Sequence, residues 1–121
     1  RRPDMYHRDL ALVSQNLFAY SYYSGAEKKT KMQMVRLHPS THQMTAVGEP
    51  TILDTGYNSF VGSIALPSRP QTPSAFTYLQ PAGKNSMAKV CGVNAEGQIS
   101  SCKEVDWAEA ELLAADAVKL P

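Results

Sequence analysis

MAKVCGVNAEGQISSCKEV, residues 87–105, contains both cysteines of the chain. Its middle, NAEG, has the composition of a tight turn and includes a glycine that can take a left-handed backbone. If a four-residue loop starts at Ala95, then Cys91 faces Cys102 on the opposite strand. A different register, with Cys91 opposite Ser100, leaves Cys102 on a diagonal. We predict the first register, which gives a β-hairpin closed by a disulfide between the two cysteines.

The same register places Lys89 opposite Glu104, an oppositely charged pair beside the disulfide. A cysteine pair at hairpin spacing favours an oxidising compartment, which is the periplasm, the extracellular space or a secretory lumen. Two reduced thiols in a cytosolic protein are the alternative. Because the chain starts at Arg1 and not at a methionine, we expect that an upstream leader or inner-membrane anchor has been removed.

The composition indicates one globular domain over residues 1–121. Hydrophobic residues make up 43% and charged residues 19% of the chain, which is typical of a folded protein. The net charge is +1, and the only cluster of cations is KKTK at residues 28–31. We therefore expect no nucleic-acid partner and no binding to an anionic membrane surface. No stretch of apolar residues is long enough to span a membrane.

Residues 4–24, DMYHRDLALVSQNLFAYSYYS, predict an amphipathic helix. Its apolar residues recur at steps of three and four, at Tyr6, Leu10, Val13, Leu17 and Tyr20. Pro3 before this stretch and Gly25 after it agree with the ends of a helix. The aromatic residues at its end favour a strand for the last turn as an alternative.

Residues 107–119 predict a second, shorter helix. Asp106 can cap its start, with Glu109 placed three residues later as in a capping box.

Between the two helices, residues 31–105 predict antiparallel strands and loops. Two strands form a hairpin, KMQMVRL at 31–37 with QMTAV at 43–47, and in it Met32, Met34 and Met44 share the core. PSRPQTPS at 67–74 predicts a surface loop, and AFTYL at 75–79 predicts a strand with Phe76 and Tyr78 on one face. The predicted fold class is α+β.

LDTG at residues 53–56 is the one stretch with the pattern of a catalytic loop. It follows an apolar run and resembles the active-site loop of the retropepsins. That resemblance implies a homodimeric aspartic protease, in which Asp54, Thr55 and Gly56 of two chains form the active site. A turn in which the Asp54 side chain binds nearby backbone amides accounts for the same residues.

The sequence contains no motif for metal binding, for cofactor binding or for thiol chemistry. His38 and His42 lie on either side of a proline turn, and His7 is the only other histidine, so we expect no metal site. The glycines form no nucleotide-binding pattern, and we expect no cofactor. With no histidine near them in the sequence, the cysteines have a structural role and are not nucleophiles.

The order of the segments resembles the globular part of type IV pilins and the small membrane-anchored accessory proteins of type IVb and conjugative thin pili. The resemblance depends on LALVSQNLFAY at 10–20, IALPS at 64–68, AFTYL at 75–79 and GVNAEGQISS at 92–101. It implies a non-enzymatic periplasmic or extracellular domain of a pilus or secretion apparatus. Such a domain acts through protein–protein contacts, for example in cell adhesion.

Exposed aromatic residues concentrate binding energy at protein interfaces when the core does not need them. On this basis we expect a protein partner to contact Tyr20, Tyr22, Tyr23, Tyr57 and Phe60. Packing in the core is the alternative role of these tyrosines. A secreted inhibitor or lectin-like binding module is a third interpretation of the chain, and no particular residue supports it.

Overall fold

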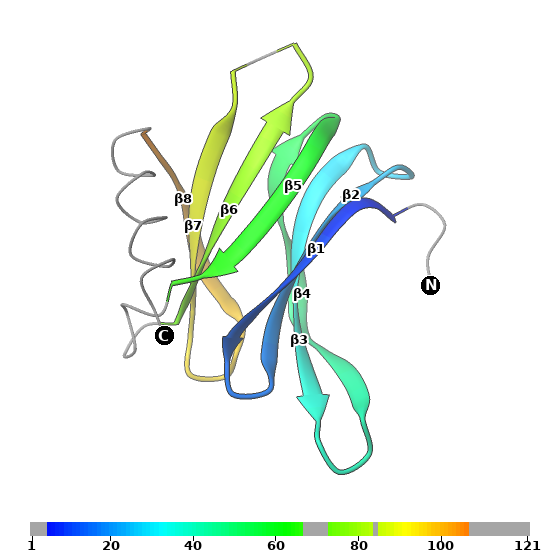
Figure 1. Ribbon diagram of the computed structural model, residues 1–121, viewed down its shortest axis with the longest axis vertical. Coiled ribbons are helices and arrows are strands. Elements are labelled where there is room, and N and C mark those ends of the chain that lie inside the picture. The colour runs from blue at the N-terminus through cyan, green and yellow to red at the C-terminus, as the bar shows by residue number, and fades with distance from the viewer. Residues whose placement is uncertain (1–4, 67–72, 84, 107–121) are drawn as a thin grey trace.

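The computed structural model describes residues 5–66, 73–83 and 85–106, which form two antiparallel four-stranded sheets (Figure 1). The first sheet consists of β1 (Met5–Ser14), β2 (Leu17–Ser24), β3 (Lys29–His38) and β4 (Gln43–Thr55), in this order. The second consists of β5 (Asn58–Ala65), β6 (Ser74–Pro81), β7 (Met87–Val93) and β8 (Ile99–Val105), also in order. Every strand within a sheet pairs with its neighbour in the sequence, so each sheet is a simple meander.

The prediction of an α+β fold is wrong, because the described part of the chain is all β and contains no helix. The segment predicted as a helix over residues 4–24 forms the β1–β2 hairpin from Met5 to Ser24, with Leu12 paired to Phe18 and Ser14 paired to Leu17. The chain reverses at Asn16, whose backbone has a left-handed φ of 59°. Asparagine tolerates that conformation better than most residues. The predicted helix at 107–119 lies outside the described residues.

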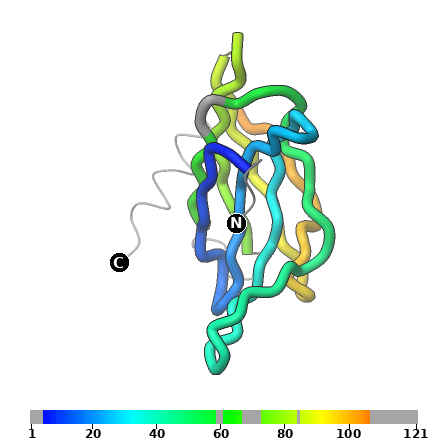
Figure 2. The backbone as a smooth tube through the Cα atoms, turned by 90° about the vertical axis from the view of Figure 1, so that its right-hand side faces the viewer, coloured from blue at the N-terminus to red at the C-terminus, as the bar shows by residue number. Residues whose placement is uncertain are grey.

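The predicted hairpin of residues 31–37 and 43–47 is confirmed as part of β3 and β4, with Leu37 paired to Met44. Its turn extends past the other turns at the same end of the molecule (Figures 1 and 2). The predicted strand at 75–79 lies within β6, and Phe76 and Tyr78 share one face of it. Most of the predicted surface loop at 67–74 lies outside the described residues.

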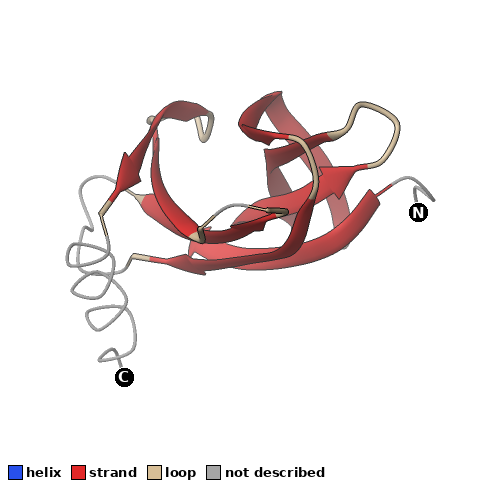
Figure 3. Cartoon of the chain, turned by 90° about the horizontal axis from the view of Figure 1, so that it is seen from above, coloured by secondary structure: helices blue, strands red, loops and turns tan. Residues whose placement is uncertain are grey.

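The two sheets curve around a shared interior (Figure 3). Buried side chains from both sheets form one core, with Leu17, Ala19, Met32, Met34 and Leu53 from the first and Val61, Ala75, Leu79, Cys91 and Val93 from the second. β1 and β5 lie side by side and join the sheets at one edge. There the carboxylate of Asp9 accepts a hydrogen bond from the backbone N–H of Ser63, with a donor–acceptor distance of 2.7 Å.

Buried hydroxyl groups lie beside this apolar core, on the side where β1 and β5 meet. The side chain of Ser63 lies 2.9 Å from the hydroxyl of Ser21 on the first sheet and 3.0 Å from that of Thr77 on the second. Ser21 and Thr77 are completely buried. Buried hydroxyls need partners, so this chain of three links the two sheets through polar contacts as well as apolar ones.

The two sheets repeat one another strand by strand. In each, a phenylalanine on the second strand pairs with an aliphatic residue on the first and a valine on the third, namely Leu12, Phe18 and Val35 against Ile64, Phe76 and Val90. A tyrosine follows two positions later in both, Tyr20 and Tyr78. The turns agree as well, because His42 and Gly97 both have a left-handed φ and both precede a glutamine. The two sheets are therefore similar four-stranded units in their strand order and in these paired residues.

The two units pack with the same face inward. Leu17 and Ala19 on β2 are buried between the sheets, and so are their counterparts Ala75 and Thr77 on β6. Corresponding faces of the two sheets therefore form the core that they share.

Candidate functional site

The cysteine hairpin is confirmed, and its role is structural. Cys91 on β7 pairs with Cys102 on β8, and their sulfur atoms are bonded. Cys91 is completely buried in the core that both sheets share. A buried disulfide at this place links strands and leaves no thiol for chemistry.

The turn of this hairpin differs slightly from its prediction. Val93 pairs with Ile99, and Gly92 with Ser101, so Ser100 is an extra residue that forms a bulge. The side chain of Asn94 accepts hydrogen bonds from two backbone N–H groups of the loop, and Gly97 has the left-handed φ, 86°. The bulge corrects the register, so the two cysteines still face each other.

Lys89 pairs in the ladder with Glu104, as predicted. Its ammonium group, however, donates a hydrogen bond to the backbone carbonyl of Leu53 on β4. Leu53 is an extra residue between two registered pairs of β3 and β4, so its carbonyl lies outside the regular ladder. Lys89 therefore connects the second sheet to the first.

Asp54 holds a turn together. Its carboxylate accepts a hydrogen bond of 2.9 Å from the side-chain amide of Asn58, and the same amide donates to the hydroxyl of Thr30 at 2.9 Å. Thr55 ends β4, and Gly56 has a φ of 96° in the turn to β5. The partner of Asp54 is thus a side-chain amide and not the backbone amides expected from the sequence.

Asn58 is the buried centre of this network, and its own carbonyl oxygen has no hydrogen-bond partner among the described residues. We predict that Asn58→Ala lowers the free energy of unfolding by about 1–3 kcal/mol, because it leaves the buried hydroxyl of Thr30 without its donor. Urea denaturation measures this loss. Gln43→Ala, at an exposed polar position, is the control and should change stability by less than about 0.5 kcal/mol. Equal losses for the two variants would contradict the role of Asn58.

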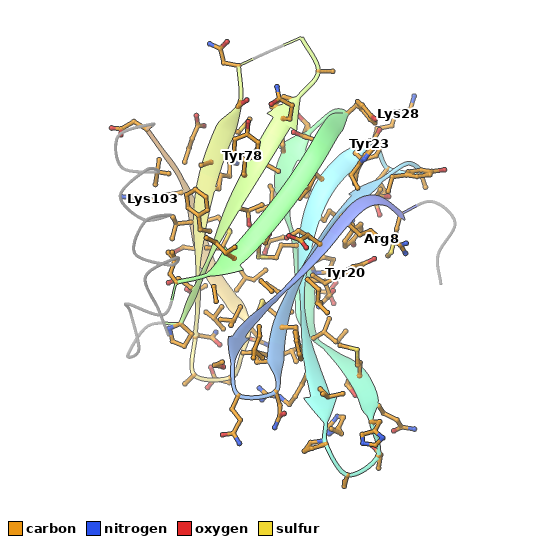
Figure 4. All side chains as sticks on the ribbon, in the orientation of Figure 1. Arg8, Tyr20, Tyr23, Lys28, Tyr78 and Lys103 are labelled. Atoms are coloured by element: carbon orange, nitrogen blue, oxygen red, sulfur yellow. A yellow bond between two sulfur atoms is a disulfide. The ribbon has the colours of Figure 1, made fainter. Side chains whose placement is uncertain are left out.

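The tyrosines expected to bind a partner separate into two groups, because Tyr20 and Tyr23, labelled in Figure 4, lie on opposite faces of β2. Tyr23 points inward and contacts Tyr57 edge to face, with ring centroids 5.1 Å apart. Tyr57 also contacts the ring of His7, and its hydroxyl lies 2.7 Å from the imidazole Nε2. Tyr23 is buried and Tyr57 is exposed. This group ties the β4–β5 turn to β1. Phe60 lies in β5, and its side chain is outside the described part of the structure.

Tyr20 and Tyr22 project to the outer face of the first sheet. Their rings stack, with centroids 5.2 Å apart and an interplanar angle of 26°. Both line a cavity of about 280 Å³, whose other walls come from β1, the β2–β3 turn, β3 and β4. The sequence identified these tyrosines but not the cavity, because the cavity depends on the register of four strands.

An exposed apolar patch occupies the outer face where β1 and β5 lie side by side, and we call it the β1–β5 patch. It consists of Leu10, Leu12 and Ile64, which are 47%, 55% and 38% exposed. Leu12 and Ile64 are equivalent positions of the two units. The helical interpretation placed Leu10 on a buried face, so this patch was not predicted from the sequence.

The described part of the chain contains no cluster of metal ligands and no helix that could cross a membrane. No three His, Cys, Asp or Glu side chains come together there in a way that could hold a metal ion. No helix within it has the length and apolar character needed to cross a membrane. Comparisons of the chain with known protein families, curated proteins and solved structures give no match. Arguments about function therefore depend on the geometry of the site.

Proposed function

We propose that the chain is a non-enzymatic binding domain of the periplasm or extracellular space that acts through contacts with another protein. The observation that carries the proposal is the β1–β5 patch, where three large aliphatic side chains lie about half exposed on adjacent strands. Contiguous exposed apolar residues mark interaction sites on soluble proteins. The disulfide supports the compartment, because such bonds persist where conditions are oxidising.

The chemistry of the patch favours an apolar surface of a different protein as the partner. Leu10, Leu12 and Ile64 carry no charge and no hydrogen-bonding side chain, so they fit a partner surface of aliphatic or aromatic residues. A stable homodimer needs about 800 Å² of surface on each subunit. Three side chains provide much less, which favours a transient contact over permanent self-association.

The setting that we propose for this contact is a pilus or secretion apparatus. The resemblance to type IV pilins began with a helix at residues 4–24, and that segment forms β1 and β2. A retropepsin-like activity of Asp54, Thr55 and Gly56 has no specific observation in its favour. The carboxylate of Asp54 is bound to Asn58 and so has a structural role of its own.

Site-specific photocrosslinking tests the proposed contact. A photoreactive amino acid at position 12, in the chain expressed in its own compartment, should form one discrete adduct with a second protein. The same amino acid at Met44, which is 49% exposed on β4, is the matched control and should not form that adduct. Leu10→Asp should abolish the adduct and leave the free energy of unfolding within about 0.5 kcal/mol of the wild type.

Three outcomes would contradict the proposal. They are the absence of any adduct at position 12, the same adducts at positions 12 and 44, and an adduct of two copies of this chain.

The compartment is tested separately by alkylating free thiols at the moment of cell lysis. Cys91 and Cys102 should resist alkylation until a reductant is added, and alkylation of both before reduction would place the chain in a reducing compartment.

A further inference from the structure

The cavity on the outer face of the first sheet has an aromatic floor. Tyr20 and Tyr22 form it with their stacked rings. The hydroxyl of Tyr20 makes a weak hydrogen bond to the sulfur of Met5 at 3.6 Å, which fixes the ring beside β1. The faces of aromatic rings are electron-rich and apolar, so they attract C–H groups that carry a partial positive charge.

A neutralised ion pair forms one wall of the cavity. The ammonium group of Lys31 lies 2.5 Å from the carboxylate of Glu27. The Lys31 side chain is only 12% exposed, whereas that of Glu27 is 52% exposed. A charged ligand of either sign would have to compete with this pair. A neutral ligand with several hydroxyl groups can donate to the carboxylate and accept from the ammonium group without separating them.

Gln33 supplies an oriented amide to the same cavity. Its NH2 group donates hydrogen bonds to the backbone carbonyls of Met34, Val47 and Gly48 at distances of 2.9–3.3 Å. These contacts hold the amide in one orientation, with its carbonyl oxygen as the remaining group that can accept from a ligand. Ser24 adds a hydroxyl to the lining.

The residues that line the cavity differ from their counterparts in the second unit. Tyr20 and its ladder partner Gln33 are 13 positions apart, whereas their counterparts Tyr78 and Ala88 are 10 apart. The β2–β3 hairpin therefore extends further beyond this pair than the β6–β7 hairpin does, and its turn contains Glu27. In the second unit, the hydroxyl of Tyr78 contacts the side chains of Gln80 and Ser86. Gln33, which supplies an amide to the cavity, thus has an alanine, Ala88, as its counterpart in the second unit.

We propose that this cavity binds one pyranose unit of a neutral glycan. An aromatic floor receives the C–H face of the sugar ring. The pair of Glu27 and Lys31, with Gln33, exchanges hydrogen bonds with its hydroxyl groups. The volume of about 280 Å³ suits a ligand the size of a monosaccharide. Apolar surfaces with a few oriented polar groups are the common composition of small-molecule sites.

Titration of the isotope-labelled domain, followed by amide NMR shifts, tests this proposal. The probes are the methyl glycosides of glucose, galactose, mannose and N-acetylglucosamine, each raised to about 10 mM, since single-sugar sites bind with a Kd on the order of 1 mM. At least one probe should shift the amides around Tyr20, Tyr22 and Lys31. Tyr20→Ala and Glu27→Gln should each weaken binding at least about tenfold. Tyr57→Ala removes an exposed tyrosine that does not line the cavity and should leave binding unchanged.

Glu27 is a half-exposed turn residue and glutamine has its shape, so the Glu27→Gln variant should fold even if Tyr20→Ala does not, which a circular dichroism spectrum checks. The absence of shifts with all four probes overturns the proposal. Shifts of unchanged size in Glu27→Gln also overturn it. So do shifts at these amides caused by a blocked tyrosine peptide and not by any sugar, because they identify the cavity as a peptide site.

Discussion

The double variant Cys91→Ala/Cys102→Ala is expected to unfold at a lower urea concentration than the wild-type chain. The disulfide spans 11 positions of the sequence. A loop of this length restricts the unfolded chain enough to contribute about 3 kcal/mol in the chain-entropy estimate. This is a large part of the stability of a typical domain. Equilibrium urea denaturation of oxidised wild type and double variant measures the difference.

The loss of stability on removal of the disulfide should affect both sheets. Cys91 packs in one core with Leu17 and Met34 of the first sheet and Val61 of the second. Hydrogen exchange of the double variant should therefore be faster in β2 and β3 as well as in β7 and β8. A reductant should destabilise the wild type and have no effect on the double variant, which serves as the control. Loss of protection confined to β7 and β8 would contradict a shared core.

The cysteine hairpin could be predicted from the sequence because its geometry is local. The turn residues and the two cysteines lie within one short stretch, so only one register brings the sulfurs together. The hairpin of β3 and β4 was predictable for the same reason, since proline, serine and threonine mark its turn. In both cases the residues that set the structure are neighbours in the sequence.

The β1–β2 hairpin was predicted wrongly because small residues of β2 point into the core and large aromatic residues point out of it. Ala19 and Ser21 point inward, whereas the larger Phe18 and Tyr20 point outward. The usual alternation of apolar residues inside and polar residues outside is therefore missing from β2. Small residues fit the interior there because Ser21 makes a hydroxyl contact across the sheets to Ser63. A contact between strands this far apart in the sequence cannot be read from the spacing within one strand.

The internal repeat and the cavity depend on the same kind of long-range information. The two units share a phenylalanine and a tyrosine, at Phe18 and Tyr20 and at Phe76 and Tyr78, but few residues around them. Which residues of the two units correspond to each other can be seen only from the strand registers. The cavity likewise combines side chains from several strands of the first sheet. The sequence could identify Tyr20 and Tyr22 as binding residues but could not show what surrounds them.

The methionines of the β3–β4 hairpin give the second large prediction. The sequence predicted that Met32, Met34 and Met44 share the core, and this is wrong for Met44. Met32 and Met34 are completely buried, whereas Met44 is 49% exposed. β4 continues past the edge of the second sheet at its start, so Met44 has no opposing layer to pack against. Position along the strand, and not residue type, decides which methionine is buried.

Met34→Ala is expected to lower the free energy of unfolding by about 2–5 kcal/mol, because the truncated side chain leaves a cavity in the core between the sheets. Met44→Ala removes the same atoms from an exposed position and should cost less than about 0.5 kcal/mol. Urea denaturation of both variants gives the comparison. Because the chemistry of the change is identical, its size measures burial alone. Similar losses for the two variants would show that the first sheet does not pack on the second through β3, and the shared core would then be wrong.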